Sequence, residues 1–114
     1  MSLSPPDRVR LRDMLEWAGK AQRFVANFTE AQFLQDARTQ SAVLHAIIVI
    51  GEAAAHISDD TQAAHPDIPW FEIRGMRNRL IHDYLGVDID VVWRTVSLDL
   101  PALTTKLEAA LAAA

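Results

Sequence analysis

Apolar residues recur along most of this chain at intervals of three and four positions, which is the spacing of one face of an α-helix. No stretch alternates apolar and polar residues for long enough to predict a β-strand. A capping hydroxyl at Ser4, followed by Pro5 and Asp7, is typical of a helix N-terminus. The first helix is therefore expected to run from there to about Ala26, and the whole pattern predicts an all-α fold.

A second, short helix is predicted after Thr29, with Gln32 at the capping-box position. The third helix is predicted over residues 36–58 and has a wide apolar face. Its other side carries four polar residues that fall within about 40° of one another at about 100° per residue. They are Arg38, His45, Glu52 and His56. Such a stripe faces solvent, a partner or a binding site, and solvent is the most common of the three.

The second half of the chain is also predicted to be helical. A loop is expected over residues 59–67, followed by a helix that begins near Trp70 and ends at Gly86. Asp88 is expected to cap the last helical stretch, which Pro101 breaks or kinks before the pattern resumes. Helices joined by short connections predict an antiparallel bundle of four to five helices.

Length and composition place limits on the class of protein. The 114 residues fit one domain, residues 1–114, and the 50% of apolar residues suffice for a core without disulfides. The absence of cysteine excludes disulfides, thiolate metal sites and cysteine nucleophiles. The N-terminus has no apolar stretch of signal-peptide length, and the apolar run at residues 46–50 is too short to cross a membrane. We therefore expect a cytoplasmic protein without a membrane segment.

The net charge of −4 argues against binding nucleic acid through bulk electrostatics. Any contact with RNA then requires a local basic patch. Arg74, Arg77 and Arg79 form the one dense basic cluster outside the first helix. The cluster is compatible with RNA binding without demonstrating it.

Sequence signatures of the common enzyme classes are missing. The chain contains no HExxH motif, calcium loop, phosphate-binding glycine loop or G-x-S-x-G elbow. Two of the four histidines, His45 and His56, share a helical face but lie about 16 Å apart along it. No metal or other cofactor is therefore expected.

The basic cluster belongs to a helix that also carries His82. His82 is predicted to point away from the core together with Arg74 and Asn78, whereas Arg77 lies at the border of that polar face, about 140° around the helix from His82. One helix does not bring Arg77 and His82 together unaided. A second copy packed across a two-fold axis would place two arginines and two histidines in one composite cleft.

Such a cleft suits cleavage of RNA without a metal, which requires a base, an acid and positive charge beside the phosphorus. Histidine serves as base or acid near neutral pH, and Arg77 would hold the phosphate through a charge-assisted fork. Ile81 and Leu85 would supply apolar contact between the two copies. The structural alternative is that Arg77 and His82 merely complete a helix, whose last turn favours basic groups. On spacing alone, this alternative is the more common.

The motif R-x4-H-x-Y, formed here by Arg77, His82 and Tyr84, resembles the signature of HepT toxins of the HEPN superfamily. The flanking segments are similar as well. They are IPW at residues 68–70, IRGMRNRLIHDY at residues 73–84, GVD at residues 86–88 and, on the third helix, IGEA at residues 50–53. R-x4-H alone is a weak pattern, but with these flanks, in the family's order, it is specific.

The resemblance implies a HEPN-like dimer that acts as a metal-independent endoribonuclease, with Arg77 and His82 as catalytic residues. It also implies that the chain is the toxin of a toxin–antitoxin pair. The antitoxin would be a minimal nucleotidyltransferase of the MNT type, which transfers AMP to Tyr84. On a regular helix Tyr84 would lie about 20° from Arg77, although a lone tyrosine at a helix end is usually a half-buried packing residue. Two residues that would support the catalytic pair each have two interpretations. Asn78 would orient the imidazole or be solvated, and Glu52 would face the arginine cluster or be one more exposed acid.

A different class of function stays open beside the nuclease. HEPN relatives also accompany nucleotidyltransferases as non-catalytic helical modules that bind a nucleotide or a partner protein without cutting RNA. The complete motif favours the nuclease, because loss of Arg77 or His82 would favour the module. A plain structural dimer is also compatible with the pattern, but it would leave the basic cluster unexplained.

Overall fold

Seven α-helical segments make up most of residues 2–113, the part of the chain that the computed structural model describes. They are α1 (Pro5–Phe24), α2 (Glu30–Leu34), α3 (Ala37–Ala55), α4 (Asp59–Ala64), α5 (Trp70–His82), α6 (Ile89–Arg94) and α7 (Leu100–Ala112). A 3₁₀ turn (Tyr84–Gly86) precedes α6, and a π-helical turn (Thr95–Asp99) joins α6 to α7. Residues 2–113 contain no β-strand, so the predicted all-α class is confirmed.

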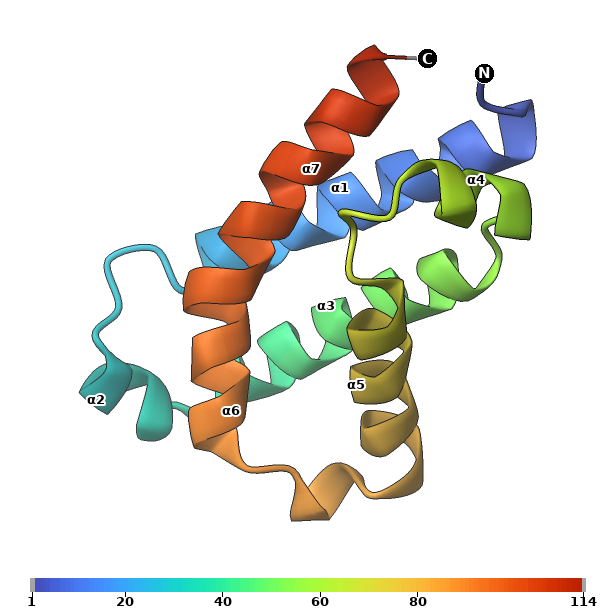
Figure 1. The fold of residues 1–114 in the computed structure, drawn as a ribbon. Coiled ribbons are helices and arrows are strands. Elements are labelled where there is room, and N and C mark those ends of the chain that lie inside the picture. Colours follow the sequence, from blue (N-terminus) through green and yellow to red (C-terminus); the bar gives the residue numbers. More distant parts are fainter. Residues whose placement is uncertain (1, 114) are drawn as a thin grey trace.

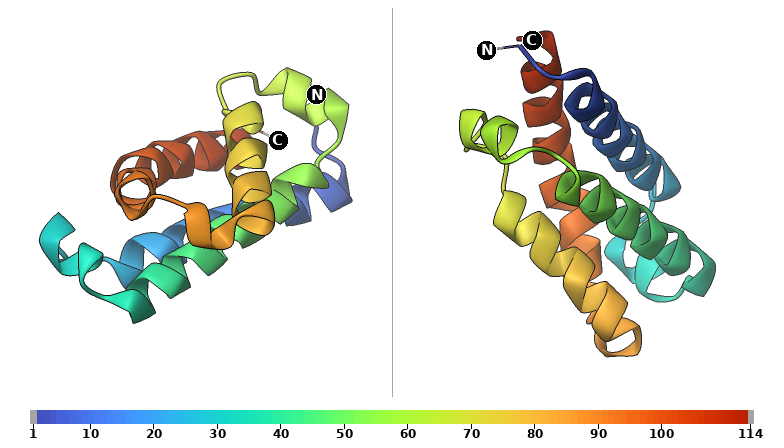
Figure 2. Two further views of the ribbon diagram at one scale, coloured as in Figure 1. Left: turned by 90° about the horizontal axis from the view of Figure 1, so that it is seen from below. Right: turned by 90° about the vertical axis from the view of Figure 1, so that its right-hand side faces the viewer.

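The long helices form a bundle around α1 and α3, which lie side by side and run in opposite directions (Figures 1 and 2). The α5 helix packs against α3, and α7 packs against α1. The short helices α2 and α4 lie at the two ends of α3 (Figure 1). This arrangement agrees with the predicted antiparallel bundle and leaves one side of α5 open to solvent.

The periodic apolar positions of the sequence form the core. Leu11 and Met14 of α1 are wholly buried, as are Val43 of α3 and Leu107 of α7. Burying a side chain of this size contributes about 1.5–3 kcal/mol relative to leaving it exposed. The core therefore fixes the positions of α1, α3 and α7, and α5 is attached to it through the buried Leu80.

The predicted helix starts are confirmed by their capping hydrogen bonds. The Asp7 N–H donates to Ser4 Oγ at 3.3 Å, and the Thr29 side chain accepts from the Gln32 N–H at 3.2 Å. The Gln32 side chain in turn accepts from the Thr29 N–H at 2.9 Å, which completes the capping box. Asp88 caps α6 by accepting from the Asp90 N–H at 2.9 Å.

The prediction of a loop over residues 59–67 is wrong in its first half, because Asp59–Ala64 form α4. The predicted third helix is correspondingly too long, since α3 ends at Ala55. Ser58 is the N-cap of the new helix and accepts from the Thr61 N–H at 3.3 Å, and two acids stand in the first turn. This capping signal lies in the sequence, but the segment has no apolar periodicity that would mark it as a helix.

The end of α5 also differs from the prediction, because the helix stops at His82 and not at Gly86. Asp83 leaves the helical conformation, and its side chain accepts from the Gly86 N–H at 3.1 Å to close the 3₁₀ turn. At Pro101 the chain stays helical. The π-helical turn before this proline precedes a change of direction between α6 and α7 (Figure 1), so the predicted kink is present without a break.

The buried carboxylate of Asp7 ties the start of α1 to the start of α4. Its Oδ1 accepts from the Ser58 N–H at 3.0 Å, and its Oδ2 accepts from the hydroxyls of Ser58 and Thr61, each at 2.6 Å. Burial by itself would raise the pKa of Asp7, but the hydrogen bonds from Ser58 and Thr61 outweigh it and lower the pKa below its ordinary value. The ionised carboxylate is therefore the form that stabilises the fold.

Asp7 is expected to make the free energy of unfolding depend on pH below about 4. Because the pKa is lower in the folded chain, the contribution is fully present above the unfolded value and is lost as the pH falls through the folded value. Asp7→Asn should remove this dependence and destabilise the chain by about 1–3 kcal/mol at pH 7, since the amide places a donor where two hydroxyls donate. Urea unfolding between pH 3 and 7 measures it, with the exposed Asp67→Asn as control. Parallel pH profiles for wild type and Asp7→Asn would contradict this role.

Candidate active site

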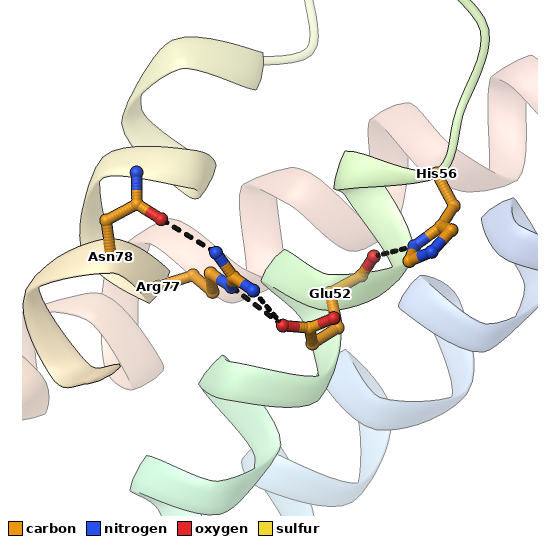
Figure 3. Close-up of polar contacts among 4 residues, drawn as sticks. All are labelled: Glu52, His56, Arg77 and Asn78. Atoms are coloured by element: carbon orange, nitrogen blue, oxygen red, sulfur yellow. Dashed lines mark hydrogen bonds and ion pairs between the residues drawn. The ribbon is translucent and has the colours of Figure 1, made fainter. Parts of the chain in front are cut away.

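Arg77 lies where α5 crosses α3, and neighbours on two sides hold its guanidinium (Figure 3). Its Nε donates to Glu52 Oε1 at 2.8 Å, and its Nη2 pairs with the same oxygen. Its Nη1 donates to Asn78 Oδ1 at 2.9 Å. The Arg77 side chain is 29% exposed and that of Glu52 43% exposed, so the ion pair is open to a ligand from solvent.

Gly51 permits this crossing of the two helices. A Cβ at Gly51 would overlap the Cβ of Arg77 and lie 2.6 Å from its Cγ. The backbone of α5 is therefore close to α3 at the residue that carries the guanidinium. In the IGEA segment, glycine provides the space and Glu52, the next residue, provides the ion-pair partner.

His82 is the last residue of α5 and is exposed to solvent. It lines a shallow surface hollow of about 340 Å³ together with Asn78, Arg79 and Asp83. Asn78 connects the two candidate residues, because it borders this hollow and accepts a hydrogen bond from Arg77. Within residues 2–113 no hydrogen bond joins Arg77 to His82 directly, so the single chain brings them to one region without direct contact.

Each of the three predicted supporting residues makes a specific contact. Glu52 faces Arg77, which was one of its two predicted interpretations. The Asn78 oxygen accepts from Arg77, so it orients the guanidinium. Arg74 is directed toward α4, where its Nη1 donates to Gln62 Oε1 at 2.7 Å. Arg74 thus links α5 to α4 through this hydrogen bond.

Tyr84 lies in the 3₁₀ turn after α5 and is 43% exposed. Its predicted position about 20° from Arg77 is wrong, because that angle assumes a helix running past His82. The alternative of a half-buried packing residue does not describe Tyr84 either, because its side chain is exposed. The tyrosine side chain stands within two residues of His82 on an exposed segment.

Sequence reasoning missed the role of Gly51 and a second, mainly apolar surface hollow. That hollow, about 650 Å³, lies between α5 and the α6–α7 run and is lined mainly by apolar side chains such as Ile47, Phe71 and Leu103. None of the candidate site residues lines it. The signal for Gly51 is a glycine inside a strongly apolar helix, which often marks a close approach of another backbone.

Residues 2–113 contain neither a metal-binding cluster nor a helix suited to cross a membrane. No group of three or more histidine, aspartate or glutamate side chains is arranged to hold a metal ion. Among these residues, no helix combines the length and the apolar character needed to span a membrane.

A family model described as "Ribonuclease HepT-like" matches residues 14–110, which include both α3 and α5. The chain belongs to the HepT-like ribonuclease family. The predicted family and the enzyme class of ribonuclease are thereby confirmed. The matched region contains Glu52, Arg77, His82 and Tyr84.

Curated relatives of this HepT-like chain carry ribonuclease names. A protein of Thermococcus cleftensis named "Probable ribonuclease HepT" is 44% identical over 101 residues, which cover 85% of this chain and 92% of the relative. A Methanocaldococcus jannaschii protein named as a candidate RNase is 35% identical over 98 residues, 86% of this chain and 90% of the relative. A Caldanaerobacter subterraneus protein, also named as a candidate RNase, is 33% identical over 76 residues, 67% of this chain and 68% of the relative. No solved structure gives a significant match to the chain.

Proposed function

We propose that this HepT-like chain is a metal-independent endoribonuclease that uses Arg77 and His82. The observation that carries the proposal is the guanidinium of Arg77, which Glu52 and Asn78 hold in place beside the hollow that His82 lines. A fixed cation next to an exposed imidazole supplies the charge and the proton transfer that phosphodiester cleavage requires.

The anchoring of Arg77 leaves part of its fork for a substrate. A guanidinium has five N–H groups, and one on each nitrogen is engaged by Glu52 or Asn78. The two N–H groups left, one on each terminal nitrogen, suit two oxygens of a phosphate. Glu52 and Asn78 are therefore positioning residues. They hold the guanidinium in place before RNA binds, so binding does not have to order it.

The proposed reaction uses the 2′-hydroxyl of RNA as the nucleophile. A neutral His82 imidazole takes the proton of that hydroxyl, the 2′-oxygen bonds to phosphorus, and Arg77 stabilises the negative charge on the phosphorane. The bond from phosphorus to the 5′-oxygen then breaks, and a second, protonated imidazole gives its proton to the leaving oxygen. The products are a 2′,3′-cyclic phosphate and a 5′-hydroxyl.

A two-fold dimer supplies the second imidazole in this proposal. Ile81 is 47% exposed and Leu85 is 96% exposed, and they flank His82 in the sequence. Two exposed apolar side chains next to a candidate catalytic residue favour an isologous contact there. Such a contact would join the hollows of two copies into one composite cleft.

We further propose that the chain is a cytoplasmic toxin, paired with a minimal nucleotidyltransferase antitoxin of the MNT type that transfers AMP to Tyr84. The exposure of Tyr84 supports this, because a transferase must reach its hydroxyl. Phosphates added to Tyr84, two residues from His82, would place negative charge where the RNA backbone is expected to bind.

Identification of the product ends tests the proposed reaction. A labelled single-stranded RNA is incubated with the purified chain in EDTA, and its fragments are analysed by mass spectrometry. We expect 2′,3′-cyclic phosphate and 5′-hydroxyl ends. Fragments with 5′-phosphate and 3′-hydroxyl ends, or cleavage that occurs only without EDTA, would contradict the proposal.

A further inference from the structure

The polar stripe of α3 extends from Glu52 away from the candidate active site. His45 precedes Glu52 by seven residues, which is two helical turns, so the two side chains share a face about 10 Å apart along the axis. Arg38 precedes His45 by the same interval and is also exposed. A substrate that reaches Arg77 along this face would therefore pass His45.

An aromatic side chain of α1 stands beside His45. The rings of Trp17 and His45 meet edge to face, with centroids 5.3 Å apart and planes at 75°. The Lys20 ammonium lies 4.1 Å from the centre of the Trp17 ring. Lys20 also pairs with Glu16 at 3.8 Å and has a side chain that is 37% exposed. One face of the indole is thus covered by a flexible, solvated side chain and not by the protein core.

The other two tryptophans make different contacts. Trp70 is 7% exposed, and its Nε1 donates to the backbone carbonyl of His65 at 2.9 Å. Trp93 packs on the buried Phe33 with ring centroids 5.3 Å apart. Among residues 2–113, Trp17 is the tryptophan whose ring lies under a lysine, which a ligand could displace.

We propose that Trp17, His45 and Lys20 form a nucleobase-binding subsite that holds single-stranded RNA on the α3 face next to Arg77. The inference rests on the proposed ribonuclease function. A base stacks on the indole in place of the Lys20 ammonium, which turns to a neighbouring phosphate. Stacking on an aromatic ring requires a base with an exposed face, which an unpaired strand offers and a duplex does not.

The charge of the chain favours such a subsite. With a net charge of −4, the protein does not attract RNA by its overall field. Affinity must then come from local contacts, and base stacking is one that does not depend on net charge. The subsite would also set the register of the strand, since a stacked base fixes which phosphate lies at Arg77.

Binding of an uncleavable RNA analogue tests the proposal. The probe is a labelled 2′-O-methyl oligonucleotide, in which the 2′-oxygen cannot attack, and affinity is measured by fluorescence anisotropy. Trp17→Ala should weaken binding about fivefold or more, and Trp17→Phe should retain most of it. Lys20→Ala should weaken binding more than Lys106→Ala, which removes the same charge from α7. Circular dichroism establishes that each variant is folded.

Removing the bases of the same probe one at a time distinguishes loss of stacking from a general loss of RNA binding. Wild type should lose affinity when one particular base is removed. The affinity of Trp17→Ala should not change when the same base is removed. Equal affinity of wild type and folded Trp17→Ala, with RNA cleavage intact, would overturn the subsite and leave the proposed function standing. A wild-type chain that neither binds the probe nor cleaves RNA would overturn both.

Discussion

Gly51→Ala is expected to destabilise the chain by about 3 kcal/mol or more, or to prevent α5 from docking on α3. The added methyl group would overlap the Cβ of Arg77 and lie 2.6 Å from its Cγ. These atoms are next to the backbone of α5, so they cannot move aside as the end of a flexible side chain can. The helix itself must shift, and with it the buried Leu80 and the guanidinium that Glu52 holds.

A matched control for this substitution lies on the partner helix. Gly75 of α5 has nothing within 4 Å of the place where a Cβ would stand. Gly75→Ala should therefore stabilise the chain by about 0.5–1 kcal/mol, through the higher helix propensity of alanine. Urea unfolding followed by circular dichroism compares the two variants. Equal midpoints would show that the close crossing at Gly51 does not support the fold.

Arg77→Ala is expected to lower the rate of RNA cleavage by about 10²–10³-fold while leaving the chain folded. The loss of activity follows from the missing positive charge beside the phosphorane. The effect on stability should stay within about 1 kcal/mol, because Glu52 is half-exposed and regains water when its partner is removed. Substitution of Arg77 is therefore expected to reduce activity without unfolding the chain, whereas substitution of Gly51 is expected to reduce stability.

Arg77→Lys distinguishes charge from geometry. Lysine keeps the positive charge but loses the planar fork that contacts Glu52, Asn78 and a phosphate at once. Its cleavage rate should fall between those of wild type and Arg77→Ala. Arg94→Ala, an exposed arginine of α6, controls for the change in net charge. If Arg77→Ala were no slower than Arg94→Ala, the arginine would have no part in the reaction.

Local signals carried much of the fold prediction. Helix starts at Ser4, Thr29 and Asp88 follow from the side chain that caps each one, and this information lies within four residues. The apolar periodicity of α1 and α3 likewise reports which face is buried. Helical spacing also placed Glu52 and Arg77 on their helices, so that a contact between them was one of two open interpretations.

Contacts between distant segments were beyond sequence reasoning. The hydrogen bonds of Asp7 with Ser58 and Thr61 join residues more than 50 positions apart, and no local sequence pattern predicts them. The end of α5 was misplaced because Asp83 competes with the helix by accepting from the Gly86 N–H. That error carried Tyr84 onto the wrong face. The close approach of Gly51 to Arg77 depends on the α3–α5 crossing, which the sequence of α5 alone does not define.

His82 is expected to transfer a proton in a reaction that needs no metal. The most direct test is the single-turnover rate of RNA cleavage in EDTA, for wild type and His82→Ala measured side by side. We predict cleavage by wild type and a rate about 10²–10⁴-fold lower for His82→Ala, with unchanged helical content. Equal rates for the two proteins, or no cleavage by wild type until a divalent metal is added, would contradict the account.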